Sequence, residues 1–155
     1  MLHNLTGQII YICTYPLIRL MVYKTNRSYV VVIYMDRVLV TKNWLGFKRQ
    51  WRLPGGGSHK GELSIDTATR ELFEETGVVV VKEQLEVLAN TVKNPKGFSY
   101  DLYAVRLKSE PEITLQYPEI LVAKFISISN LMQVTNKGED LTFALQQLGN
   151  SGFIC

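Results

Sequence analysis

The sequence predicts a single α+β domain. The chain has 155 residues, of which 46 % are hydrophobic and 20 % are charged, a composition typical of one globular domain. Short runs rich in β-branched and aromatic residues lie both before and after one helical stretch in the middle of the chain. A second helical stretch follows near the C-terminus. Strands on both sides of a central helix favour an α+β arrangement of layers.

Residues 1–27 are predicted to form an apolar arm or helix ahead of the domain, which we expect over residues 28–155. Residues 9–23 are almost entirely apolar, but they are fewer than the ~20 that a membrane-spanning helix needs, and they include Pro16 and Arg19. No Lys or Arg precedes them, which argues against a secretory signal. We expect the arm to pack on the domain or across a homodimer; peripheral membrane contact by residues 9–23 is the alternative.

A hairpin is predicted at the start of the domain. Residues 28–35 form a continuous β-branched and aromatic run, as in a central strand. A tight turn at Asp36 leads to the return strand over residues 38–42. After a loop, residues 51–53 are expected to form a short strand that leads into a proline and three glycines.

The central helix is predicted to begin at Ser64 and to end just before Gly77. The Ser64 hydroxyl suits an N-cap, because its oxygen can accept from N–H groups of the first turn. Gly77 suits a left-handed C-cap. Ile65, Ala68 and Leu72 recur at helical spacing and form one narrow apolar stripe.

Further strands and a terminal helix are predicted after the central helix. The expected strands cover residues 78–81, 85–92, 99–107 and 123–128. A polar loop over residues 108–118 precedes the last strand, and Ser129 or Asn130 caps a short turn after it. The terminal helix covers residues 139–148 and ends at Gly149.

Three glutamates are crowded on one face of the central helix. Glu71 lies three residues before Glu74 and four before Glu75, so the side chains are neighbours. Like charges at these spacings destabilise a helix by roughly 0.2–0.5 kcal/mol per pair. Arg70 can pair with Glu74, but one arginine cannot neutralise three carboxylates. A hard divalent cation such as Mg²⁺ or Mn²⁺ can do so; the alternative is a solvated acidic face.

The loop before the helix extends this pattern. Counted from Gly56, it is Gly, five residues, Glu62, seven residues, and then Arg-Glu-Leu, one residue, Glu-Glu, one residue and Gly-Val, ending at Val78. This resembles the Nudix box, G-x5-E-x7-R-E-U-x-E-E-x-G-U, where U is a bulky aliphatic residue, and every fixed position matches. The resemblance implies a Nudix-type α/β/α sandwich with a central mixed β-sheet.

The same resemblance implies Mg²⁺-dependent hydrolysis of the diphosphate linkage in a nucleoside diphosphate joined to another moiety, with Mn²⁺ as a second metal. The substrate class includes NTPs and dNTPs, NDP-sugars and ADP-ribose. One alternative is an RNA 5′-pyrophosphohydrolase or an enzyme that removes damaged dNTPs. Another is a nucleotide-sensing domain without catalysis.

The resemblance also implies roles for individual residues. Glu74 and Glu75 match the metal ligands of the family, and Gly56 matches the position whose backbone carbonyl binds metal. Glu71 matches the residue that binds or deprotonates the attacking water, or that supports the metal ligands. Arg70 is expected to orient Glu71 or Glu74 through charge-assisted hydrogen bonds. Glu62 is expected to support the junction between loop and helix, with direct metal contact as the alternative.

One further carboxylate is expected from a loop after the box. Glu119, just before the last strand, looks like the additional metal ligand or general base of the family, and Glu110 and Glu112 are its alternatives. His59 is the irregular position, because many members carry an acidic residue there. It is expected either to contact phosphates or to be an exposed loop histidine.

Aromatic and basic residues before the box are candidates for substrate binding. Trp44, Arg49 and Arg52 precede it, and Tyr100 lies on a later strand. Aromatic rings stack on bases, and basic side chains hold phosphates. Trp51 is expected in the core; the alternative for the charged residues is a solvated loop.

Net charge and cysteine content indicate which class of partner and which compartment to expect. The net charge of +3 suits an anionic small molecule but falls short of the basic character of a nucleic-acid-binding protein. Two cysteines, Cys13 and Cys155, make no disulfide framework and no zinc motif. We therefore expect free thiols in a reducing compartment, and a cytoplasmic protein.

Overall fold

The computed structural model describes residues 26–44, 49–93, 99–115 and 119–150; the predicted arm over residues 1–27 lies almost wholly outside them. The elements in chain order are β1 (Arg27–Tyr34), β2 (Arg37–Asn43), β3 (Gly55–Gly57), α2 (Ser64–Thr76), η1 (Lys82–Gln84), β4 (Glu86–Lys93), β5 (Ser99–Leu107), β6 (Ile120–Ser127), α3 (Ile128–Gln133) and α4 (Glu139–Asn150).

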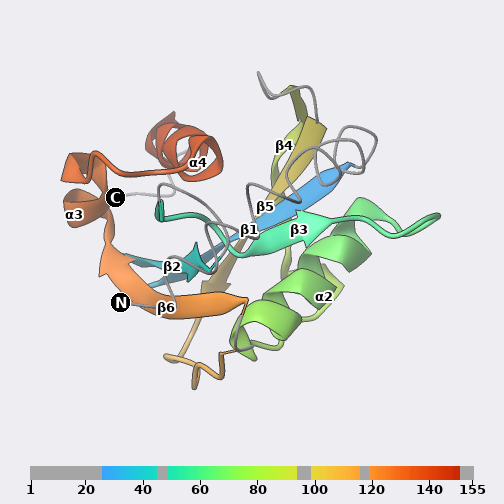
Figure 1. Cartoon of the computed structure of the whole chain (residues 1–155), viewed down its shortest axis with the longest axis horizontal. Helices are drawn as coiled ribbons and strands as arrows, with labels where there is room; N and C mark the ends of the chain where they lie inside the picture. Colours follow the sequence, from blue (N-terminus) through green and yellow to red (C-terminus); the bar gives the residue numbers. More distant parts are fainter. Residues whose placement is uncertain (1–25, 45–48, 94–98, 116–118, 151–155) are drawn as a thin grey trace.

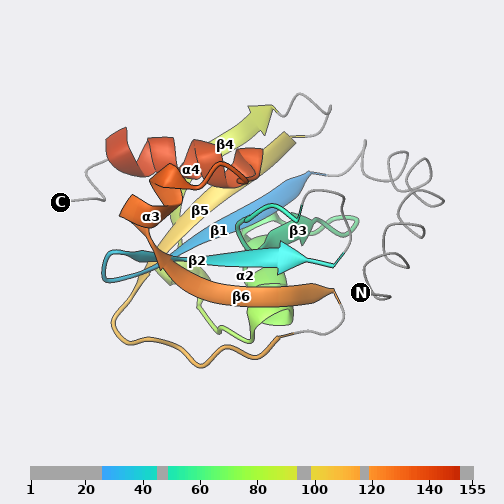
Figure 2. The same cartoon turned by 60° about the vertical axis from the view of Figure 1, so that its left-hand side comes forward.

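The strands form one mixed sheet. Its order is β4-β5-β1-β2-β6, with the short β3 paired to β1 away from this path. β1 runs parallel to β5, and the other paired strands are antiparallel. Figure 1 shows α2 on one side of the sheet and α4 on the other, and Figure 2 shows the strands side by side. The predicted α+β fold, an α/β/α sandwich around a mixed sheet, is confirmed.

Alternate residues of β1 supply the two halves of the core. Val30 and Val32 face α2 and pack with Ala68 and Leu72 from the predicted helical stripe. The neighbouring residues of β1 face the other way and pack against α3 and α4. β1 is therefore buried on both faces, which explains its continuous apolar sequence.

Two predicted strands are absent. Residues 51–53 make only isolated bridges, from Trp51 to Lys137 and from Arg52 to Thr41. Residues 78–81 pair with no strand, although Val78 and Val80 are buried in the core half that includes α2. A run of valines can cover the core as an extended segment, but a strand also needs a partner for its backbone. Conversely, the glycines of β3 have no side-chain pattern and form a strand because β1 offers them backbone partners.

The helix ends also differ from prediction. The N-cap of α2 is Leu63, whose carbonyl accepts from the amide of Thr67; Ser64 instead shares a hydrogen bond with the Tyr103 hydroxyl at 2.5 Å. Ser127 caps α3 through the amide of Asn130. The terminal helix continues through Gly149 to Asn150. The left-handed C-cap at Gly77, with φ of 72°, agrees with prediction.

Candidate active site

Arg70 lies at the centre of the box and joins its loop to α2. Its Nη1 donates to Glu71 and to Glu74, both at 2.9 Å. Its Nε and Nη2 donate to the two carboxylate oxygens of Glu62, at 2.8 and 3.0 Å, and Nη2 also donates to the Gly57 carbonyl at 3.0 Å. The hydrogen bonds that Arg70 donates to Glu62 are the main reason that the pKa of Arg70 is raised. Arg70 therefore orients three carboxylates at once.

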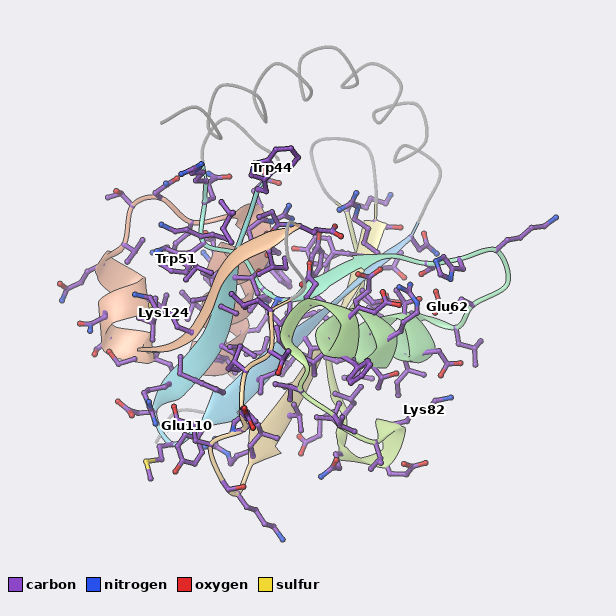
Figure 3. The ribbon with its side chains drawn as sticks, turned by 60° about the horizontal axis from the view of Figure 1, so that its bottom comes forward. Trp44, Trp51, Glu62, Lys82, Glu110 and Lys124 are labelled. Atoms are coloured by element: carbon purple, nitrogen blue, oxygen red, sulfur yellow. The ribbon has the colours of Figure 1, made fainter. Side chains whose placement is uncertain are left out.

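Glu62 is hydrogen-bonded at the junction between the box loop and α2. Besides Arg70, it accepts a hydrogen bond from the His59 amide at 2.8 Å. The hydrogen bonds from Arg70 are the largest cause of its low pKa, about 2. Glu62 is thus charged at neutral pH and accepts the hydrogen bonds that hold the loop; Figure 3 shows it beside α2. The His59 side chain is 73 % exposed.

Glu75 is the most deeply buried carboxylate of the box. The residue is 5 % exposed, and its Oε2 accepts from the Gly55 amide at 2.9 Å. Burial raises its pKa to about 8; the hydrogen bond from Gly55 opposes this shift, whereas the negative charges of Glu71 and Glu119 add to it. Without a bound cation, this carboxyl group is therefore held largely in its neutral form at neutral pH.

Glu71 lies directly against the glycine loop. A β-carbon placed on Gly56 would fall 2.6 Å from the Glu71 carboxylate, so any larger residue here would displace that carboxylate. Burial raises the pKa of Glu71; the hydrogen bond and charge of Arg70 lower it, and the charges of Glu74 and Glu119 raise it further. The box thus places a carboxylate against a backbone that approaches closely because it has no side chain.

Glu119 comes to this region from the start of β6. Its carbonyl accepts from the Trp44 amide at 2.8 Å, which ties it to the end of β2. Its charge acts on both Glu71 and Glu75. The fold therefore brings Glu119 from the distant loop within electrostatic range of two box carboxylates.

The oxygen donors of the box suit a metal ion in kind but are not yet gathered around one point. Within the described residues, no three His, Cys, Asp or Glu side chains already converge closely enough to hold one. Glu74, with its side chain 44 % exposed, lies against Arg70. The donors are nonetheless all oxygens on one helix, one strand end and a glycine backbone, which suits Mg²⁺ or Mn²⁺ by ligand chemistry.

Two predicted substrate residues have structural partners. Arg52 makes an ion pair with the buried Asp140 at 3.1 Å and donates to the Tyr29 hydroxyl at 2.9 Å, but 34 % of its side chain is still exposed. Its substrate role therefore stays a prediction. Tyr100 is 3 % exposed, and its ring packs edge-on against Tyr29 and Phe143. Burial raises the pKa of Tyr100 to about 12. The Tyr100 side chain is covered by the core, which does not fit its predicted contact with a substrate.

The remaining candidates lie nearer the surface. Trp44 is partly buried beside Glu119, and Arg49 is exposed with its carbonyl accepting from the Asn136 amide group at 3.4 Å. Glu110, an alternative to Glu119, is instead held by two hydrogen bonds from Arg37, at 3.0 and 2.8 Å.

Two backbone groups contribute to the site without any side-chain signal. The Gly55 amide holds Glu75, and the Gly57 carbonyl holds Arg70. The sequence shows only a glycine run here, and nothing in its pattern indicates which backbone atoms face the helix.

Comparison with known proteins places the chain in a family. The family model of the NUDIX domain matches residues 24–145. The chain belongs to the Nudix family. It is 35 % identical over 98 residues to nucleoside diphosphate-linked moiety X motif 6 of Mus musculus, which covers 61 % of this chain and 31 % of that protein. It is 50 % identical over 52 residues to the RNA pyrophosphohydrolase of Dinoroseobacter shibae, and the match covers 34 % of this chain and 29 % of that protein. This Nudix chain thus matches about a third or less of the length of these relatives.

Solved structures show the same Nudix fold. The NUDIX domain of Shewanella oneidensis NrtR, complexed with ADP ribose, matches with a TM-score of 0.67 and 20 % identity, over 82 % of this chain and 87 % of that one. A second match is a bifunctional NMN adenylyltransferase/ADP ribose pyrophosphatase from Francisella tularensis, complexed with AMP and a Mn ion. Its TM-score is 0.69 at 22 % identity, and the match covers 96 % of this chain and 48 % of that one. In the described part of this chain, the helices are too short or too polar to cross a membrane.

Proposed function

We propose that this protein is a Mg²⁺-dependent hydrolase that cleaves the diphosphate linkage of a nucleoside diphosphate joined to another moiety, with Mn²⁺ as a substitute metal. The observation that carries the proposal is the buried Glu75 held against the glycine loop: burial first, and then the charges of Glu71 and Glu119, raise its pKa, and burial also raises the pKa of Glu71. Carboxylates that repel one another are stabilised by a divalent cation, and a substrate that binds through this cation stabilises the site further.

The roles proposed for the metal-binding residues are those of the matching Nudix box positions. Glu74, Glu75 and the Gly56 carbonyl would hold the metal, with Glu71 and Glu119 as further ligands. A bound divalent cation would neutralise phosphate oxygens and lower the pKa of bound water. Glu71 or Glu119 would accept the proton of the attacking water.

The positioning and substrate residues complete the proposed site. Arg70 positions Glu71 and Glu74 through the hydrogen bonds described above. Trp44, which is tied to Glu119 through its backbone, is proposed to stack on the base, and Arg49 to contact the phosphates.

A substrate panel tests this proposal. Nucleotide or phosphate release is measured with Mg²⁺ for (deoxy)NTPs including damaged dNTPs, NDP-sugars, ADP-ribose and NADH. We expect turnover of at least one, lost in Glu74→Gln and Glu75→Gln and kept in Glu86→Gln, an exposed glutamate on β4. No turnover across the panel, or full activity in both box variants, would overturn it. Ligand binding that needs metal but gives no turnover would instead indicate a nucleotide sensor.

An RNA 5′-pyrophosphohydrolase is the second candidate. The observation that favours it is the 50 % identity over 52 residues to an RNA pyrophosphohydrolase. A 5′-triphosphate oligonucleotide and GTP are compared at two salt concentrations. Preference for the oligonucleotide, with binding that weakens steeply with salt, would replace the small-molecule proposal. A cytoplasmic location and a homodimer are further proposals, which cell fractionation and sedimentation test.

A further inference from the structure

Asp140 is a buried carboxylate on the opposite side of the sheet from the box helix. It lies in the first turn of α4, and the residue is 2 % exposed. Its Oδ1 accepts from the Nε of Arg52 at 3.1 Å, and its Oδ2 accepts from the Leu53 amide at 2.9 Å. Figure 1 shows α4 and α2 on opposite sides of the sheet. Both partners of Asp140 belong to the segment just before the box, so this carboxylate links α4 to the box loop.

Stability alone does not explain a carboxylate at this position. A buried charge loses its hydration, and replacing a buried ion pair by apolar residues often leaves a protein equally or more stable. The surroundings of the carboxylate are tight, since a β-carbon on Gly138 would fall 2.5 Å from Asp140 Oδ1 and 3.1 Å from Arg52 Cγ. What an apolar residue could not supply here is an acceptor for the Leu53 amide.

The segment before the box is also attached to two strands. Two hydrogen bonds join the backbone of Arg52 to that of Thr41 on β2, at 2.9 and 3.0 Å. The Pro54 carbonyl accepts from the Val30 amide on β1 at 3.0 Å. Leu53 lies between these attachments, and α4 supplies the partner of its amide. The path of the backbone into the box is therefore fixed from three elements.

Leu53 is closely coupled to the box carboxylate Glu75. Two residues after Leu53, the Gly55 amide donates to Glu75 Oε2 at 2.9 Å. The intervening Pro54 has a fixed φ, and a residue before proline is restricted to extended backbone, so few torsions between the two amides can change. Because proline has no N–H, the amides of Leu53 and Gly55 are consecutive donors, the first to α4 and the second to α2. A shift of one is therefore transmitted to the other.

We propose that Asp140 is a positioning residue for the metal site of the box. By accepting from the Leu53 amide, it fixes the backbone from which the Gly55 amide holds Glu75. The inference deepens the proposed function and rests on it, because Glu75 is one of the carboxylates proposed to hold the metal. Loss of a residue that keeps a metal ligand in place typically weakens metal binding by about 10–100-fold.

Two substitutions of Asp140 separate its hydrogen bond to Leu53 from its charge. Asp140→Asn and Asp140→Leu have nearly the same shape, and both remove the ion pair with Arg52. Only Asp140→Asn keeps a carbonyl oxygen that can accept from the Leu53 amide.

The first readout is hydrogen exchange of the Gly55 amide, measured by NMR in EDTA, and it needs no metal. The amide of Leu102, on the interior strand β5, reports global opening in the same sample. Relative to Leu102, exchange at Gly55 should become at least about tenfold faster in Asp140→Leu and change less than about threefold in Asp140→Asn.

The second readout is binding of Mn²⁺ alone, followed by electron paramagnetic resonance of the free ion. Its affinity should fall at least about tenfold in Asp140→Leu and stay within about threefold of the parent in Asp140→Asn. Leu148→Ala is the matched control, because Leu148 is buried on the same helix, about 12 Å further along it. This control should lower the melting temperature but leave relative Gly55 exchange and Mn²⁺ affinity within about twofold.

The outcomes separate this inference from the proposed function. Unchanged Gly55 exchange in Asp140→Leu, unchanged Mn²⁺ affinity there, or an equal loss in Leu148→Ala overturns the positioning role, while turnover in the substrate panel leaves the proposed function intact. A parent that binds no Mn²⁺ overturns the proposed metal site, whereas faster Gly55 exchange in Asp140→Leu still supports the hold of Asp140 on the loop. If Asp140→Leu does not fold, Arg52→Met/Asp140→Leu and Arg52→Met/Asp140→Asn give the same comparison without the unpaired arginine.

Discussion

Replacing Glu75 by glutamine should stabilise the metal-free protein while abolishing its activity. Glutamine keeps the size of the side chain and a carbonyl oxygen that can accept from the Gly55 amide, now 2.9 Å from Glu75. It removes the ionisable group, whose pKa in the folded protein is raised from 4.5 to about 8, mainly by burial. The substitution therefore separates the cost of a buried charge from the function that the charge serves.

The sign and size of the effect follow from the two pKa values. Glu75 has a higher pKa in the folded protein than in the unfolded chain, so its contribution to stability is fully present only below the unfolded pKa of 4.5. This stability is lost as the pH rises from 4.5 to about 8. One pKa unit corresponds to ~1.4 kcal/mol, so the interval sets an upper bound of roughly 5 kcal/mol. Relaxation and water entry around the carboxylate reduce such penalties, so we expect Glu75→Gln to gain about 2–3 kcal/mol at pH 8.5.

Urea unfolding in EDTA at pH 5 and at pH 8.5 measures this effect. The free energy of unfolding of the parent should be lower at pH 8.5 than at pH 5, whereas that of Glu75→Gln should decrease less over the same interval. The m-value should be the same for both proteins. At pH 5 the two proteins should be nearly equal. Mg²⁺ at pH 8.5 should stabilise the parent and not the variant. A variant that is equal to or less stable than the parent at pH 8.5 would refute the argument that burial and repulsion destabilise the charged Glu75.

Three other substitutions probe the same region. Gly56→Ala should lower kcat by about 100-fold, because its β-carbon would fall 2.6 Å from the Glu71 carboxylate, whereas Gly149→Ala, with nothing within 4 Å, should leave kcat unchanged. Arg70→Lys should lower kcat by about tenfold or more and weaken Mg²⁺ activation, since one ammonium cannot replace the hydrogen bonds to three carboxylates. Tyr100→Phe should leave KM within about twofold, because the ring is buried; a large rise in KM would restore its predicted substrate role.

Much of the fold follows from local patterns in the chain. The β-branched run of β1, the hairpin to β2 and the stripe of α2 are visible because their periodicity reports directly which side is buried. Strand partners are not visible in this way. Residues 78–81 are β-branched, as in a strand, but have no strand partner, and the glycines of β3 have one without any side-chain pattern. Backbone pairing depends on which segments the whole fold brings together.

The partners of the substrate candidates could not be predicted for a similar reason. Arg52 precedes the box among basic residues, as a phosphate ligand would, but its partner Asp140 is 88 residues away and reaches it only through the packing of α4. Tyr100 lies on the side of β5 that α4 covers, so its ring is buried. In both cases long-range packing determines which groups the side chain contacts.

The box itself shows how far residue spacing determines chemistry. Glu62 and Glu75 are both fixed glutamates of the same motif, yet the fold gives them opposite electrostatic environments. Glu62 meets Arg70 and has a pKa of about 2; Glu75 is buried beside other carboxylates and has a pKa of about 8. The first is already neutralised by the protein and needs no metal to be stable. The second lacks a cation of its own, and so it is Glu75, with its neighbours Glu71 and Glu119, that a divalent metal would stabilise most.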